Sequence, residues 1–348
     1  MKRRNHLYRV AINGYGRIGQ CLLRALVTGP HAGHFQVVAI NELADLETIS
    51  YLTRYDTTHG RFPLPVGHGD GHLVIGGQRI RVWHEGEPAR LGWVGEKIDL
   101  LFECSGSFSD RLTAGAYLQS GVARILFSHP ADPDIDATIV FGVNDHLLRT
   151  GHRIVSAASC TTNCITPVLS LLDQAFGVEC GLVTTIHSAM NDQPLIDSYH
   201  NTNLRLTRSA LHSIIPVDTG LAKGISRILP AMRERFQCLH LRVPTINVSA
   251  MDLSVNLARP ATLAAVNHLF REAAAGPWQR LLAATDEPQA SVDFNTDPHS
   301  VIVDTTQTRL CGDRMLKLLL WFDNEWGFAN RMLDVGHLWL TRTADFQK

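Results

Sequence analysis

The sequence predicts an α/β protein with two domains: a doubly wound, mostly parallel sheet, followed by an α+β domain with a mixed or antiparallel sheet. The length of 348 residues suits two domains that each bury a core. Short apolar strands alternate with helices up to about residue 157, which is typical of a parallel sheet. After residue 182 the strand-like runs are longer, which indicates a sheet of another kind.

The first domain opens with a predicted βαβ unit. Its parts are the strand Arg9–Asn13, the glycine-rich turn Gly14–Gly19, the helix Gln20–Val27, which ends near Gly29-Pro30, and the strand Phe35–Asn41. The further strands are His72–Ile75, Gln78–His84, Asp99–Cys104, Ala123–Phe127, Ala137–Val143 and Arg153–Ser156, with a helix at Arg111–Gln119. Gly76-Gly77 predicts a hairpin between the first two of these strands.

The second half of the chain is predicted to form the α+β domain. Its expected strands are Leu182–His187, Leu239–Val243, Ala250–Ala258, Ser300–Asp304 and Lys317–Phe322. Its expected helices are Thr161–Phe176, Val217–Ile228 and Ala261–Ala275. Pro167 should kink the first helix. We place the first domain at 1–158, completed by a C-terminal helix in 327–348 whose part Gly327–Leu340 reads as amphipathic, and the second domain at 159–326.

Composition excludes several classes of protein. An apolar fraction of 45% with 19% charged residues excludes a disordered or fibrous chain. The formal net charge of -1 gives no field that attracts nucleic acid or an acidic membrane, so we expect neither partner. No run of eighteen apolar residues occurs, so no membrane span is expected. The basic start, Met1–His6, leads into a strand and glycines and does not resemble a signal peptide.

Cysteine and histidine usage bears on compartment and metals. The seven cysteines are scattered and odd in number, which argues against a disulfide framework and favours a reducing compartment such as the cytoplasm. The 17 histidines form no HExxH motif and accompany no paired CxxC motif. We therefore predict no metal site.

The turn Gly14–Gly19 has the pattern GxGxxG between a strand and a helix. Gly14 allows the tight turn, Gly16 lets the backbone approach a pyrophosphate, and Gly19 lets the helix pack closely on the strand. Glu42 follows the second strand, where an acid hydrogen-bonds an adenine ribose, and no arginine beside it would take a 2′-phosphate. The pattern predicts a Rossmann domain that binds NAD in preference to NADP. The alternative is a tight turn in a protein that binds no dinucleotide.

A candidate nucleophile, Cys160, stands between a strand and a helix. The first turn of a helix stabilises a thiolate, so we expect a lowered thiol pKa there. A structural cysteine at a helix cap is an equal alternative, and Cys164, one turn further on, reads as packing. His187 ends a strand and is the candidate base, although a histidine there is more often structural. The functional hypothesis requires the Cys160 sulfur and the His187 imidazole to converge beside the reactive ring of a bound dinucleotide.

These residues, with motifs along the whole chain, resemble the glyceraldehyde-3-phosphate dehydrogenase family. The motifs are AINGYGRIG (11–19), YDTTHGRF (55–62), SCTTNC (159–164), TTIHS (184–188), DTGLAKGI (218–225), RVPTINVS (242–249) and DNEWGFANRM (323–332). Four further segments resemble the erythrose-4-phosphate dehydrogenase branch: INELAD (40–45), FSHP (127–130), IHSAM (186–190) and VDFNTDPHS (292–300). The resemblance implies oxidation of D-erythrose 4-phosphate to 4-phosphoerythronate with NAD, a place in pyridoxal phosphate biosynthesis, and a homotetramer.

The resemblance also implies roles for particular residues. Cys160 attacks the aldehyde to give a thiohemiacetal, His187 takes the hydroxyl proton, and hydride transfer to the nicotinamide leaves a thioester. Asn324 hydrogen-bonds the nicotinamide carboxamide, although its local alternative is a turn residue in DNEWG. The implied cofactor-binding residues are Gly14, Arg17, Ile18, Gly19, Glu42, Ser128 and Asn324.

Two anion sites are implied in the same way. The one near the attacked carbon uses Ser159, Thr161, Thr219 and the Gly220 backbone. The site for the substrate's own phosphate uses Arg242 with Asp192 and a polar residue at the place of Met190, and Arg208 is implied as a further phosphate-binding residue. The alternative for Arg242 is a structural ion pair.

Two positions depart from the family pattern. Met190 stands where the glycolytic enzymes have a phosphate-binding threonine, and Leu206 where a second arginine is frequent. Both changes remove polar partners of an anion, so we expect water to resolve the thioester in place of phosphate. The rivals are a phosphorylating glyceraldehyde-3-phosphate dehydrogenase of glycolysis, a nucleic-acid or regulatory binding module, and a cysteine hydrolase without cofactor.

Overall fold

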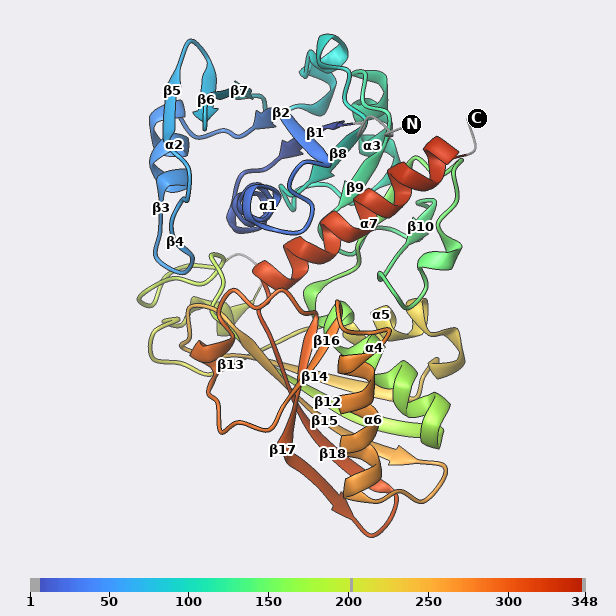
Figure 1. The fold of residues 1–348 in the computed structure, drawn as a ribbon. Helices are drawn as coiled ribbons and strands as arrows, with labels where there is room; N and C mark the ends of the chain where they lie inside the picture. Colours follow the sequence, from blue (N-terminus) through green and yellow to red (C-terminus); the bar gives the residue numbers. More distant parts are fainter. Residues whose placement is uncertain (1–6, 201–202, 346–348) are drawn as a thin grey trace. The chain divides into compact units, whose positions relative to one another are not determined.

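The chain divides into two compact units in the computed structural model, which describes residues 7–200 and 203–345 (Figure 1). The N-terminal unit comprises Met1–Ser159 and Ala329–Lys348, and the second unit comprises Cys160–Phe328. The basic segment Met1–His6 and the last three residues of the expected C-terminal helix lie outside the described residues. In the part of the chain that the structure describes, no helix is both long and apolar enough to cross a membrane.

The N-terminal unit is built on a nine-stranded sheet in the order β10-β11-β9-β8-β1-β2-β7-β6-β5. The strands are β1 (Tyr8–Asn13), β2 (Phe35–Asn41), β5 (Val66–Gly69), β6 (His72–Ile75), β7 (Gln78–Trp83), β8 (Leu100–Glu103), β9 (Ile125–Phe127), β10 (Ala137–Thr138) and β11 (Ile154–Ser156). All pairs are parallel except β5 with β6 and β6 with β7. The predicted doubly wound sheet and its glycine hairpin are confirmed.

The βαβ unit follows from its apolar pattern. In β1, Val10, Ala11 and Ile12 are fully buried, as expected for a central strand covered on both faces. The helices of this unit are α1 (Arg17–Thr28), α2 (Leu46–Arg54) and α3 (Arg111–Gln119), and a two-stranded pair is formed by β3 (Tyr55–Asp56) and β4 (Gly60–Arg61). The prediction missed α2, although Asp45 caps it by accepting from the Thr48 backbone N–H at 2.8 Å.

One predicted strand is much shorter than expected. Strand β10 ends at Thr138, whereas the apolar run continues to Val143. The Val140 N–H donates to the Asn144 side chain at 2.7 Å, and the Asn144 amide donates to the Thr138 carbonyl at 2.9 Å. These side-chain bonds replace the ladder, so the chain turns although its residues are apolar.

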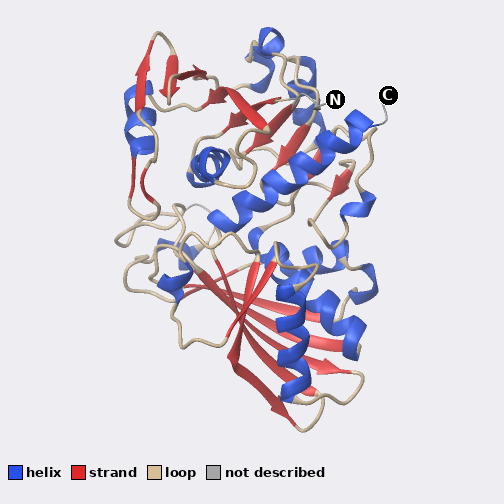
Figure 2. Cartoon of the chain, viewed as in Figure 1, coloured by secondary structure: helices blue, strands red, loops and turns tan. Residues whose placement is uncertain are grey.

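The second unit holds a seven-stranded mixed sheet in the order β13-β14-β12-β15-β18-β17-β16. The strands are β12 (Val178–His187), β13 (Ile215–Val217), β14 (Phe236–Arg242), β15 (Ser249–Leu257), β16 (Leu282–Thr285), β17 (Val301–Cys311) and β18 (Met315–Phe322). The helices are α4 (Cys160–Phe176), α5 (Leu221–Ile228) and α6 (Leu263–Ala275). β12 with β14 and β16 with β17 are parallel, and the other pairs are antiparallel. The predicted mixed sheet is confirmed, and Figure 2 shows its strands with helices packed alongside.

Two helix predictions need correction. Helix α5 begins at Leu221 and not at Val217, because Ile215–Val217 pairs with β14 and Thr219 Oγ1 accepts from the Leu221 N–H at 3.2 Å. Helix α4 (Cys160–Phe176) contains Pro167 and ends at the predicted residue, and it starts one residue earlier than predicted. The terminal helix α7 (Trp326–Asp345) is not amphipathic between Gly327 and Gly336, since every residue there is buried.

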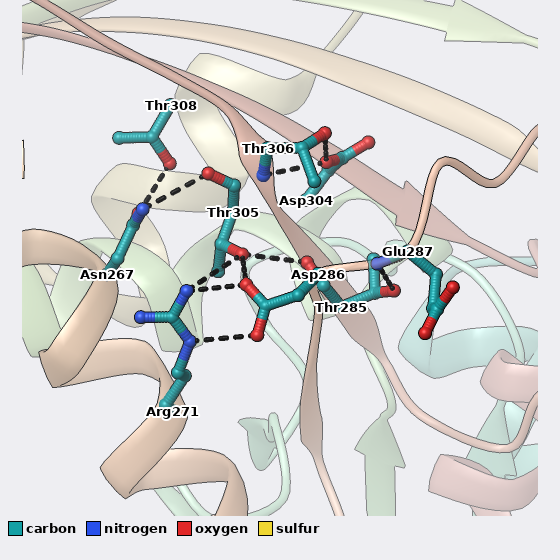
Figure 3. A network of polar contacts seen from close by, with 9 residues as sticks. All are labelled: Asn267, Arg271, Thr285, Asp286, Glu287, Asp304, Thr305, Thr306 and Thr308. Atoms are coloured by element: carbon teal, nitrogen blue, oxygen red, sulfur yellow. Dashed lines mark hydrogen bonds and ion pairs between the residues drawn. The ribbon is translucent and has the colours of Figure 1, made fainter.

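A polar network holds an irregularity at the edge of the second sheet (Figure 3). The register of β17 against β18 shifts between Asp304 and Arg309. Asn267 of α6 donates to the Thr305 carbonyl at 3.1 Å and accepts from the Thr308 hydroxyl at 2.7 Å. Arg271 pairs with Asp286, and this hydrogen-bonded ion pair lowers the pKa of Asp286 to about 2. The network supplies partners for backbone groups that the shifted register takes out of the ladder.

Candidate active site

A cavity of about 260 Å³ lies in the N-terminal unit. It lies where the strand order reverses, because β1 pairs with β2 on one side and with β8 on the other. Its lining includes residues that follow these three strands: Gly14, Glu42 and Ser105. Open α/β sheets bind ligands in the crevice at such a switch point.

The glycine turn has the geometry that a dinucleotide requires. Gly14 has φ +82°, and a Cβ there would overlap the Ser105 backbone. A Cβ on Gly19 would overlap the Gly14 carbonyl oxygen, so close packing of α1 requires glycine. A Cβ on Gly16 meets no atom within 4 Å, which leaves the backbone open on that side. Arg17, the first residue of α1, pairs with Asp56 at 2.7 Å, and Ile18 follows it half-buried.

The carboxylate of Glu42 lies against the glycine turn Gly14–Gly19. One oxygen accepts from the Tyr15 N–H at 2.8 Å and the other from the Leu43 N–H at 2.7 Å. A carboxylate held by two amides in the cavity wall can accept hydrogen bonds from ribose hydroxyls. The residues present therefore fit the adenosine half of NAD.

Cys160 is the first residue of α4. Two residues earlier, Ala158 has φ +62°, which is a strained backbone conformation for a residue with a side chain. His187 ends β12 and its Nε2 lies 3.8 Å from the Cys160 Sγ. Its Nδ1 lies 2.8 Å from the Ser188 carbonyl oxygen. Because a carbonyl only accepts, the neutral ring carries its proton on Nδ1 and presents the lone pair of Nε2 to the sulfur. The Cys160 sulfur and the His187 imidazole thus lie close together in this unit, as predicted.

The expected lowered pKa of the Cys160 thiol is wrong. Burial raises the pKa of Cys160 to about 12 and outweighs the backbone N–H groups of Thr161 and of Cys160 itself, which act the other way. Burial also lowers the pKa of His187 below its usual value, against the hydrogen bond to Ser188. Both groups are therefore neutral at pH 7, and the imidazole is ready to accept the thiol proton.

Asn324 is fixed close to His187. Its side-chain oxygen accepts from the Ser188 hydroxyl at 3.1 Å and from the Ser249 hydroxyl at 2.8 Å. The amide NH₂ is thereby set as the donor group of this side chain. Val248, before Ser249, is a β-branched residue at φ +62°, which is strained backbone next to the site.

Arg242 lies beside His187 in the register of β12 and β14. Its guanidinium forms an ion pair with Asp192 and contacts Gln193 Oε1 at 3.4 Å. The Arg242 side chain is largely buried, and its positive charge also lowers the pKa of His187. A basic group held here can bind an anion near the reactive pair, in exchange for or together with Asp192.

Comparison with known families gives two matches, and together they cover most of the chain. Residues 8–111 match the family described as glyceraldehyde 3-phosphate dehydrogenase, NAD binding domain. Residues 159–324 match glyceraldehyde 3-phosphate dehydrogenase, C-terminal domain. The chain belongs to the glyceraldehyde-3-phosphate dehydrogenase family. It is an NAD-dependent dehydrogenase with a Rossmann NAD-binding domain and a C-terminal catalytic domain, as predicted.

The other residues that the family resemblance singles out lie in several places. Ser159 and Thr161 flank Cys160 in the chain, and Ser128 follows β9 in the N-terminal unit. Thr219 and Gly220 form the start of α5, after β13. Arg208 is exposed and pairs with Asp197 at 2.9 Å, so the contacts of its guanidinium are to its own loop. Their roles in this family member stay predictions.

One side chain next to the site was missed. The His240 ring stacks on the His187 ring, with centroids 5.0 Å apart and an interplanar angle of 28°. Burial lowers the pKa of His240 to about 3, so this ring is neutral. The sequence places residues 240 and 242 on one face of a strand, but only the register of β14 against β12 brings the His240 ring to His187.

Proposed function

We propose that this dehydrogenase oxidises D-erythrose 4-phosphate to 4-phosphoerythronate with NAD, and that water releases the product from a thioester. The observation that carries the chemistry is the His187 lone pair 3.8 Å from the Cys160 sulfur. A phosphorylated sugar aldehyde fits the family and the basic side chain of Arg242 beside this pair.

The residues of the chain would act in three steps. The Cys160 sulfur forms a bond to the aldehyde carbon while its proton passes to His187 Nε2, and that proton then goes to the former carbonyl oxygen. In the second step Nε2 removes the hydroxyl proton, the C–H bond breaks, and a thioester forms. Bound NAD supplies the acceptor for the hydride of that bond. In the third step water attacks the thioester, loses one proton to solvent and gives the free acid, while the C–S bond breaks. The departing sulfur takes the proton that Nε2 received in the second step, which restores the thiol and the neutral imidazole.

Two side chains support water over phosphate in the third step. Met190 is 46% exposed and presents a thioether, which cannot donate a hydrogen bond to an anion. Leu206 is 8% exposed, so it packs inward and adds no polar group. With Arg242 already paired to Asp192, fewer donors remain for an inorganic phosphate.

The decisive experiment is product analysis with each of two aldehydes, with and without inorganic phosphate. We expect a larger kcat/KM for D-erythrose 4-phosphate than for glyceraldehyde 3-phosphate, and a free acid as product whether or not phosphate is present. Met190→Thr should increase formation of acyl phosphate, whereas the control Met315→Thr, another exposed methionine, should not. Strict dependence on phosphate in the unmodified protein would overturn the proposal.

The alternative is a phosphorylating glyceraldehyde-3-phosphate dehydrogenase of glycolysis. It is favoured by Ser159, Thr161 and Thr219, which keep hydroxyl groups at the positions that the family uses for an anion near the attacked carbon. The phosphate dependence above separates the two.

Glu42 supports NAD over NADP, because a 2′-phosphate would meet its carboxylate in the cavity wall.

We further propose a homotetramer in the cytoplasm that feeds pyridoxal phosphate synthesis. None of the seven cysteines, all of which lie in the described residues, forms a disulfide bond, which suits a reducing compartment. Leu182 is 63% exposed and Leu239 47% exposed on strands of the second sheet, which supports coverage by another subunit. Sedimentation or light scattering would measure the assembly.

A further inference from the structure

Three histidines gather in the N-terminal unit, and none has a part in the proposed reaction. His31 and His34 come from the turn between α1 and β2, and His337 comes from α7. One ring nitrogen of each lies within 4.8 Å of those of the other two. The ring centroids of His31 and His337 are 5.1 Å apart, and those of His34 and His337 are 4.5 Å apart. The chain thus brings residues from its two ends into one cluster.

The surroundings of His31 resemble those of a metal ligand. Its Nε2 lies 2.7 Å from Asp334 Oδ1, one turn before His337 on α7. The other oxygen of Asp334 is 2.7 Å from Arg331. Metal-binding histidines usually give their second nitrogen to a carboxylate, which fixes the ring and its tautomer. This contact assigns Nδ1 as the nitrogen of His31 that would face a metal.

His34 carries a second, independent sign. Its Nδ1 is buried and forms no hydrogen bond within the described part of the chain. A buried polar nitrogen without a partner costs free energy, and a bound cation would remove that cost. The His34 and His337 rings are half-buried, so an ion can reach the cluster from solvent.

We propose that His31, His34 and His337 bind one Zn²⁺ ion, with water as the fourth ligand. Three imidazoles suit zinc and its neighbours in the transition series and do not suit Mg²⁺ or Ca²⁺, which prefer oxygen ligands. Zn–N bonds of about 2.0–2.1 Å place two tetrahedral ligands about 3.4 Å apart. Cluster nitrogens that lie 4.8 Å apart must therefore approach by about 1.4 Å to bind one ion, which rotation of the half-buried His34 and His337 side chains can supply.

The site would join the turn after α1 to the C-terminal helix. Since the unfolded chain does not hold three imidazoles together, zinc binding would stabilise the folded unit. The cluster contains neither Cys160 nor His187, so we assign it a structural role and not a catalytic one.

The test measures zinc retained by the full-length chain, made without an affinity tag, after dialysis against a small excess of Zn²⁺. All variants carry Cys160→Ser, which removes the reactive thiol as a zinc ligand. The test variant adds His34→Ala and His337→Ala, while His31 is kept because it bonds to Asp334. The matched control adds His68→Ala and His146→Ala, two exposed histidines of the same unit that lie outside the cluster.

We expect one zinc per chain in the parent and in the control, and none in the test variant. Zn²⁺ at 100 times its Kd should raise the Tm of the parent by about 5 °C and leave that of the test variant unchanged. Co²⁺ in place of Zn²⁺ should give the visible bands of a four-coordinate nitrogen site in the parent and in the control, and no such bands in the test variant. If the alanine variant fails to fold, His34→Gln with His337→Gln takes its place. Equal zinc content in test and control, or no zinc in the parent, would overturn the proposal.

Discussion

The two units make their functional surfaces in different ways. The N-terminal cavity depends on a backbone turn that requires glycine at residues 14 and 19, and its wall includes the carboxylate of Glu42. The second unit relies on side chains, since Cys160 starts a helix and His187 ends a strand 27 residues later. A local sequence pattern determines the backbone surface almost completely. The chemical state of the side-chain pair depends on residues that distant strands bring to it, so substitutions should affect binding in one unit and reaction rate or pH dependence in the other.

The largest effect should come from Cys160→Ser. A hydroxyl is a far weaker nucleophile than a thiolate, so NADH production should fall by at least about 10³-fold. NAD binding, measured by quenching of protein fluorescence, should be unchanged, because the cavity lining lies in the N-terminal unit. A loss of NAD binding would contradict the division of roles.

His187→Asn should reduce kcat by about 10²–10⁴-fold, because it removes the acceptor of the thiol proton. The pH profile gives a sharper test. Burial lowers the pKa of His187, so the ring stays neutral down to a pH below 6.5 and the acid limb of kcat/KM should lie below that value. The limb should be absent from the residual activity of the variant. A limb above pH 6.5 in the parent would show that the imidazole is not desolvated as the structure indicates.

The lowered pKa of His187 also makes the stability of the folded chain depend on pH. The unfolded chain binds a proton to this imidazole more readily than the folded chain does, so the free energy of unfolding should fall as pH drops below the unfolded value near 6.5.

The glycine turn allows a matched pair of variants. Gly14→Ala forces a side chain into left-handed backbone and onto Ser105, so it should destabilise the N-terminal unit by about 1–3 kcal/mol. Gly16→Ala meets open space and should leave Tm within about 2 °C of the parent. It should nevertheless weaken NAD binding by about tenfold, since the methyl group occupies the side from which a pyrophosphate approaches. Thermal unfolding and an NAD titration of both variants separate the two effects.

The sequence predicted what depends on local signals. Helix α3 was predicted to its exact ends, because Asp110 caps its start by accepting from Thr113 at 2.8 Å and Gly121 follows its end at φ +102°. Strand β10 was overpredicted because a single side chain, Asn144, took its hydrogen bonds. No pattern of apolar residues contains that information.

In the candidate site, too, the sequence predicted the local features and missed those that depend on the fold. The motifs identified Cys160 and His187, but the direction of the Cys160 pKa was predicted wrongly. A helix start lowers a thiol pKa in isolation, and only the folded structure shows that burial around the sulfur outweighs it. His240 was missed because its role depends on the register of β12 and β14, which places residue 240 opposite Thr185 and its ring on that of His187.

The smallest predicted effect tests this last contact. His240→Ala removes a stacked ring worth about 0.5–1.5 kcal/mol, so kcat should fall by about two- to tenfold. The space also admits water, and the pKa of His187 should rise towards 6.5, moving the acid limb of kcat/KM upward. His240→Phe keeps an apolar ring in place and should leave the limb where it is. If alanine and phenylalanine shift the limb equally, His240 acts through its own nitrogen atoms. If neither shifts it, other residues of the sheet bury His187, and the pKa of this imidazole depends on the sheet without a contribution from His240.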